Sequence, residues 1–191
     1  MENTRASLLL RASQGEESAW RRLVDLYQPL VRAWLLRQQV RPQEAEDLTQ
    51  DVLAVLVKQL PRFEHAGRPG AFRAWLRAVT LNRARLFWRA GSARAEAGGE
   101  ALGRIEALAD PDSPLSRLWD EEHDAHVLRR LLALMEQEFE PATLRAFRRL
   151  TFDGAAGQEV ADELGMTLAA VYGAKSRVLQ RLRQEAQGLL D

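Results

Sequence analysis

Residues 158–172 read QEVADELGMTLAAVY, and this stretch decides how the C-terminal part of the chain folds. Val160, Ala161 and Leu164 are spaced as the buried side of a short helix. Gly165 follows, and glycine readily adopts the left-handed conformation that ends a helix. Thr167 can then cap a second helix that turns Val171 inward. The spacing predicts two helices that meet at a large angle across a short turn, the helix-turn-helix pattern.

The second of these helices carries polar and basic side chains on its outer side. Such groups can bond base edges and phosphates, as a recognition helix must. An ordinary helical hairpin with a solvated basic face is the alternative interpretation. The side chains concerned are Tyr172, Lys175, Ser176, Arg177 and Arg181.

The preceding sequence also has helical periodicity, and no alternating strand pattern competes with it. Apolar residues at steps of three and four predict a helix over 18–39, with a kink or break at Pro29. Further helices are predicted over 43–60, 71–90, 115–139 and 141–150, and a turn-rich loop over 65–70.

Residues 91–114 are rich in glycine, proline and acids, which favours a linker with at most a short helix in it. We therefore predict an all-α protein with two helical domains, an N-terminal bundle and a C-terminal helix-turn-helix domain, joined by a flexible acidic linker. The predicted ranges are 1–92 for the first domain, 93–122 for the linker and 123–191 for the second domain.

Composition excludes several classes of function. The chain of 191 residues has no cysteine, which excludes disulfides, thiolate zinc sites and thiol nucleophiles. No phosphate loop, nucleophile elbow or pair of catalytic carboxylates is present, so we expect no enzyme and no cofactor. His123 and His126 have helical spacing for two ligands, but further convergent ligands are missing and we expect no metal. The N-terminus lacks a secretory or membrane-spanning segment, so we expect a cytoplasmic protein.

The net charge of zero conceals a segregation of charge along the chain. Residues 71–94 contain six arginines and no acid, and residues 168–183 contain four basic residues and no acid. Between them, residues 96–124 hold nine acids against two arginines. The pattern predicts two cationic working surfaces separated by an acidic middle.

Two of the predicted helices have surfaces that suit a partner. On the helix over 43–60, Asp47, Gln50 and Asp51 form a narrow polar stripe between apolar flanks. This favours a helix that a partner partly buries, although a central bundle helix with one wet edge remains the alternative. The helix over 71–90 combines arginines with Trp88, and stacking on bases together with phosphate contact is how proteins hold single-stranded nucleic acid.

Three stretches resemble the sigma factors of bacterial RNA polymerase, in particular the small extracytoplasmic-function (ECF) type. Residues 47–53 (DLTQDVL) resemble the region 2.2 motif, residues 72–82 (FRAWLRAVTLN) the promoter-melting segment, and residues 154–182 region 4. The resemblance covers roughly 13–90 and 126–185. It implies a non-enzymatic transcription initiation factor whose partners are core RNA polymerase, promoter DNA and an anti-sigma factor in some members.

The resemblance also implies site residues in this chain. Polymerase binding falls on Asp47, Leu48, Gln50 and Asp51, and recognition and melting of the −10 element on Arg77, Asn82, Arg83, Arg85, Trp88 and Arg89. Recognition of the −35 element falls on Tyr172, Gly173, Lys175, Ser176, Arg177 and Arg181.

The chain departs from the family pattern at two places. Leu86 stands where an acid is common, and Ala169, Ala170 and Gly173 replace larger polar residues in the recognition helix. Readout of DNA shape could then contribute to specificity. The competing hypothesis is an autonomous helix-turn-helix regulator with an N-terminal interaction domain.

Overall fold

The computed structural model describes residues 7–63, 68–89 and 92–190, and the side chains of these ranges other than 92–98. No strand occurs in the described ranges, which confirms the all-α prediction. The elements are α1 (Leu8–Ser13), α2 (Glu17–Arg37), α3 (Pro42–Gln59), η2 (Leu60–Arg62), α4 (Ala71–Arg89), α5 (Ser92–Ile105), η3 (Glu106–Ala109), α6 (Pro114–Glu138), α7 (Pro141–Thr151), α8 (Gly157–Leu164) and α9 (Leu168–Ala186).

The helices α1 to α4 form a bundle around large buried side chains. Tyr27 and Trp34 on α2 are fully enclosed, and the ring of Phe72 on α4 lies 5.3 Å from that of Tyr27. Pro29 does not break α2, which runs through it. The proline is on the exposed side, and buried Leu26 and Leu30 on either side hold the helix against the bundle.

The predicted linker contains more helix than the sequence interpretation expected. Residues 92–109 form α5 and η3, and both pack against α4. Ala101, Ile105 and Leu108 are buried at steps of four and three, the period of a helix face. The glycines at 98, 99 and 103 favour loops and concealed this stripe, whose burial against α4 stabilises the helix.

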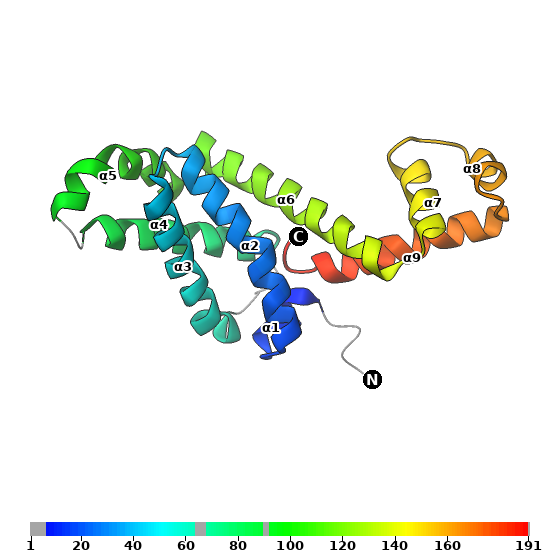
Figure 1. The fold of residues 1–191 in the computed structure, drawn as a ribbon, viewed down its shortest axis with the longest axis horizontal. Coiled ribbons are helices and arrows are strands. Elements are labelled where there is room, and N and C mark those ends of the chain that lie inside the picture. The colour runs from blue at the N-terminus through cyan, green and yellow to red at the C-terminus, as the bar shows by residue number, and fades with distance from the viewer. Residues whose placement is uncertain (1–6, 64–67, 90–91, 191) are drawn as a thin grey trace.

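A single helix, α6, connects the two ends of the molecule (Figure 1). Its first half packs on α2 and α4, where Trp119 meets Trp34 edge to face with ring centroids 4.8 Å apart. Its second half packs on α9. The predicted start of the second domain at residue 123 therefore falls inside a continuous helix, and one hydrophobic core runs from the bundle into α9.

The C-terminal helices form the predicted helix-turn-helix. Gly165 has a φ of 63° and ends α8 in the left-handed conformation. The Thr167 side chain accepts a hydrogen bond from the backbone N–H of Ala170 at 3.2 Å and so caps α9. A small core between the helices contains Val160 and Val171.

Removing the cap of α9 should lower stability moderately. Thr167→Ala is expected to cost about 1 kcal/mol, because one of the first N–H groups of α9 loses its acceptor. Thr151→Ala, at the exposed end of α7, is the matched control. Urea denaturation of both variants checks the effect, and an unchanged midpoint for Thr167→Ala would show that the cap contributes no stability.

Candidate functional surfaces

The polar stripe predicted on α3 lies on the surface. Asp47, Gln50 and Asp51 are all exposed, and the Gln50 amide donates to Glu46 Oε1 at 3.4 Å. The Arg32 guanidinium donates to the other oxygen of Glu46 at 2.9 Å. The stripe therefore presents free acids beside an intramolecular ion pair.

The apolar flanks of this stripe are mostly covered by the protein itself. Leu48 is 1% exposed, and Val52, Leu53 and Leu56 are buried in the bundle. Leu48 thus holds α3 in place and does not reach a partner in this conformation, whereas Val57 is exposed. The bundle accounts for the flanks, so the case for a partner rests on the exposed acids and Val57.

One side of α4 presents groups suited to a nucleic-acid strand. Asn82 and Arg89 are exposed, and Arg83 is half-buried. With Arg85 and the exposed Leu86, they line a hollow of about 390 Å³. The combination of amide, guanidinium and an apolar side chain can contact both bases and phosphates.

Two other residues expected at this surface are not available to DNA in this conformation. Trp88 is 2% exposed and packs into the core, with its ring edge to face with Phe87. Arg77 is 8% exposed, and its Nη1 donates to Asp120 of α6 at 3.0 Å. Both residues lie on the side of α4 that packs against the rest of the protein, together with the buried apolar residues of this helix.

Arg85 is also engaged within the chain. Its Nε donates to Glu106 of η3 at 2.8 Å, and its Nη2 donates to the second oxygen of the same carboxylate. This bidentate bond lowers the pKa of Glu106 and raises that of Arg85. The folded linker thus covers part of the basic side of α4.

The outer side of α9 carries most of the residues expected at the −35 element. Tyr172 is 53% exposed, Ser176 and Arg177 are exposed, and Lys175 is half-buried. Gly173 lies beside Arg177, since a Cβ there would come 3.2 Å from the arginine Nη1. These groups form one continuous polar face.

Gly157 is a residue that the sequence interpretation missed. A Cβ at this position would come 2.6 Å from the Tyr172 hydroxyl, so the tyrosine lies directly over the start of α8. The absence of a side chain at residue 157 lets Tyr172 join the two helices. A glycine before a predicted helix carries no signal for this contact in the sequence.

Arg181 does not lie free on the recognition face. It donates to Glu138 at 2.7 and 3.1 Å and also pairs with Glu185, and these hydrogen bonds raise its pKa. The expectation of a free phosphate contact at Arg181 does not hold for this conformation. The residue instead joins α9 to the end of α6.

His123 and His126 hold α6 against α2. The two ring nitrogens of His123 contact the Tyr27 hydroxyl at 3.1 Å and Asp124 Oδ1 at 2.9 Å. His126 donates from Nε2 to the Leu26 carbonyl at 2.8 Å, and burial lowers its pKa. Burial also disfavours the charged form of Tyr27 and so raises the pKa of its hydroxyl. These contacts give both histidines a structural role.

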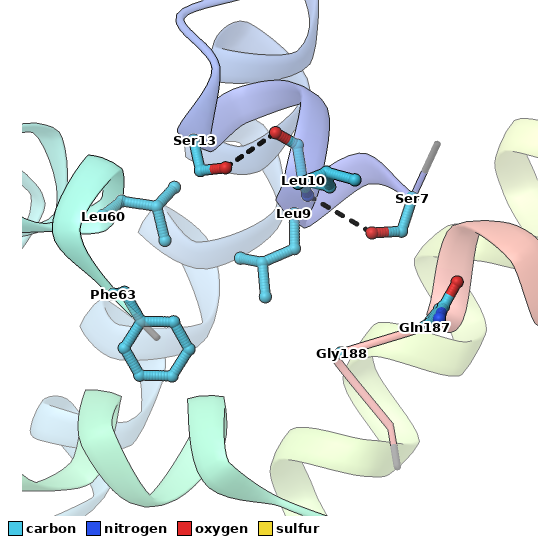
Figure 2. A pocket seen from close by; sticks show the side chains of 8 residues that line it. All are labelled: Ser7, Leu9, Leu10, Ser13, Leu60, Phe63, Gln187 and Gly188. Atoms are coloured by element: carbon cyan, nitrogen blue, oxygen red, sulfur yellow. Dashed lines mark hydrogen bonds between the residues drawn. The ribbon is translucent and has the colours of Figure 1, made fainter. Parts of the chain in front are cut away.

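A pocket of about 290 Å³ lies where both ends of the described chain meet η2. Figure 2 shows Leu9 of α1 extending into the space beside Leu60 and Phe63, with Gln187 and Gly188 on the other side. Among the described residues the lining is largely apolar and contains no charged side chain, so these residues offer packing and no catalytic chemistry. Within the described residues, no helix is long and apolar enough to span a bilayer.

Comparison with known proteins identifies the family of the chain. The model of the Sigma-70 region 2 family matches residues 23–94, from α2 into α5. The chain is 32% identical to the ECF RNA polymerase sigma factor ShbA of Streptomyces griseus, over 95% of this chain and 94% of that protein. It is 28% identical to the ECF RNA polymerase sigma factor SigD of Mycobacterium tuberculosis, over 94% and 82% of the two chains. The chain therefore belongs to the ECF family of RNA polymerase sigma factors, which are not enzymes but bind core RNA polymerase and direct promoter-specific initiation of transcription.

Proposed function

We propose that this sigma factor binds its partners through three surfaces, on α3, α4 and α9. The stripe Asp47, Gln50 and Asp51 on α3 binds core polymerase. The observation that carries this proposal is that these side chains are exposed while Leu48, on the same helix, is turned inward. A pull-down of core polymerase with the wild-type chain and with Asp51→Arg tests it, because the substitution abolishes capture only if the stripe makes the contact.

The −10 element is proposed to bind the exposed side of α4. Asn82, Arg83 and Arg89 supply the first contacts, and Arg85 joins them once it leaves Glu106. The preceding loop over 65–70 belongs to the same surface in this proposal, although residues 64–67 lie outside the described part of the chain. Trp88 stays in the core and takes no part.

The two DNA surfaces belong to separate units in this proposal, 1–92 for the −10 element and 123–191 for the −35 element, with 93–122 between them. Within this division the first half of α6 packs on the first unit, because Trp119 and His123 are buried beside α2. In this proposal the chain acts in the cytoplasm as a subunit of RNA polymerase, and an anti-sigma factor regulates it, since ECF sigma factors often have one.

The −35 element is proposed to contact Tyr172, Gly173, Lys175, Ser176 and Arg177 on α9. Arg177→Ala should weaken binding to all promoter sequences and reduce the salt slope by about one, because a phosphate contact is lost. Ser176→Ala should instead relax the preference at one base pair, at a cost of roughly 1–3 kcal/mol. Transcription by reconstituted holoenzyme from a randomised −35 library distinguishes the two results. If neither variant alters promoter selection or salt dependence, α9 is not the reading helix.

A further inference from the structure

The acidic middle of the chain lies on the basic side of α4. Asp124 of α6 accepts from Arg73 at 2.5 Å, and Asp120 accepts from Arg77 at 3.0 Å. Glu106 of η3 accepts hydrogen bonds from Arg85 through both carboxylate oxygens. Three arginines of α4 are thus neutralised by acids 21 to 51 residues further along the chain.

Hydrogen bonds from the arginines lower the pKa of two of these three acids. Burial by itself would raise the pKa of Asp124, but hydrogen bonds from His123 and Arg73 lower it below its ordinary value. Glu106 is likewise held ionised by Arg85. The three acids nevertheless remain partly exposed, so they can part from the arginines without becoming buried unpaired charges.

A second contact joins the C-terminal helix α9 to the N-terminal bundle. Glu185 near the end of α9 is 1% exposed and accepts from Arg11 of α1 at 3.1 Å through each oxygen, and it also pairs with Arg181. The chain after α9 continues into buried Leu189 in the common core. The helix α9 contacts α1 as a result. Figure 2 shows Gln187 and Gly188 on the side of the pocket opposite Leu60 and Phe63.

We propose that the acidic segment 106–124 is an intramolecular competitor for DNA that occupies the arginines of α4 until the sigma factor meets polymerase and promoter. A guanidinium that forms a forked bond to a carboxylate has the geometry that it needs for a phosphate, and the two partners exclude each other. Opening releases Arg73, Arg77 and Arg85 together. The inference rests on the proposed role of α4 at the −10 element.

The test is binding of single-stranded DNA to the free full-length chain. The variant Glu106→Gln/Asp120→Asn/Asp124→Asn should bind a fluorescent 20-nucleotide strand of mixed sequence about tenfold more tightly than wild type. Its salt slope should be steeper by about two, since each further phosphate contact to a single strand adds roughly 0.7. The control Glu17→Gln/Asp25→Asn/Glu140→Gln removes the same charge at exposed positions away from α4. An equal gain in DNA affinity in the two variants would show that net charge alone causes the effect, and it would overturn the proposal.

Opening itself can be measured, because the chain has no cysteine of its own. Dyes on cysteines introduced at the exposed positions Gln59 of α3 and Gln158 of α8 report the separation of the two ends by energy transfer. Transfer should fall when core polymerase is added to the wild type, and should already be lower in the acid-to-amide variant. Unchanged energy transfer in both cases would contradict the proposal. The single variant Glu106→Gln changes the most exposed of the three acids and repeats the test with the ion pairs of α6 intact.

A further variant separates failure of this inference from failure of the proposed −10 role. Within the described residues Arg83 and Arg89 form no ion pair, so Arg83→Ala/Arg89→Ala removes α4 contacts and leaves the ion pairs of Arg73, Arg77 and Arg85 in place. If this variant binds the strand as wild type does, α4 is not the strand-binding surface. If it loses binding while the acid-to-amide variant matches its control, α4 binds DNA and the acidic segment does not compete.

Discussion

Asp51→Arg is expected to weaken binding of the sigma factor to core RNA polymerase by roughly 100-fold, equivalent to about 2.7 kcal/mol. Asp51 is exposed on α3, so the substitution leaves the bundle core untouched. A complementary surface that desolvates the stripe would then face a charge of the wrong sign, and such like-charge contacts cost several kcal/mol. Fluorescence titration of labelled sigma with core polymerase measures the change.

The matched control for this experiment is Glu17→Arg, which makes the same charge change on the exposed side of α2. It should bind core polymerase like wild type, and both variants should retain the wild-type melting temperature to within a few degrees. If Asp51→Arg binds as tightly as the control, polymerase uses another surface and the proposed role of α3 is wrong.

Loss of promoter opening with retained polymerase binding is expected for Arg83→Ala/Arg85→Ala/Arg89→Ala. These side chains provide the cationic part of the hollow on α4, and without them the single strand loses about three phosphate contacts. Glu106 loses its partner in this variant but remains partly exposed, so the fold should tolerate the change. Permanganate footprinting of the promoter measures opening, and co-purification measures polymerase binding.

Three exposed arginines elsewhere provide the control for this triple variant. Arg21→Ala/Arg62→Ala/Arg129→Ala removes the same charge and should open the promoter at the wild-type level. Normal opening by the α4 variant would refute the −10 assignment. Loss of polymerase binding along with opening would instead indicate a misfolded protein, and circular dichroism would detect it.

The helices could be predicted from the sequence because their signals are local. The periods of α2, α3, α4, α6 and α7, the left-handed Gly165 and the Thr167 cap each depend on a few neighbouring residues. The length of α5 was not predicted for the same reason. Its glycines are local loop signals, whereas the burial of Ile105 and Leu108 depends on α4, which lies earlier in the chain.

The exposure of the predicted site residues could be predicted only in part. A sequence shows that Trp88, Arg77 and Arg181 have the chemistry to bind DNA, but it does not show what packs against them. The enclosure of Trp88 depends on the whole bundle, and the partners of Arg77 and Arg181 lie 43 residues away along the chain. Pairings over such distances leave no trace in residue spacing.

The sequence alone therefore determined the all-α class, the helix-turn-helix, the exposed stripe on α3 and the separation of basic from acidic segments. The tertiary structure alone decided that the acidic segment lies on the arginines of α4, and that Glu185 joins α9 to α1. The physical reason is the distance along the chain over which each interaction acts. Helix formation and capping act within a few residues, whereas ion pairing and burial depend on which surfaces the folded chain brings together.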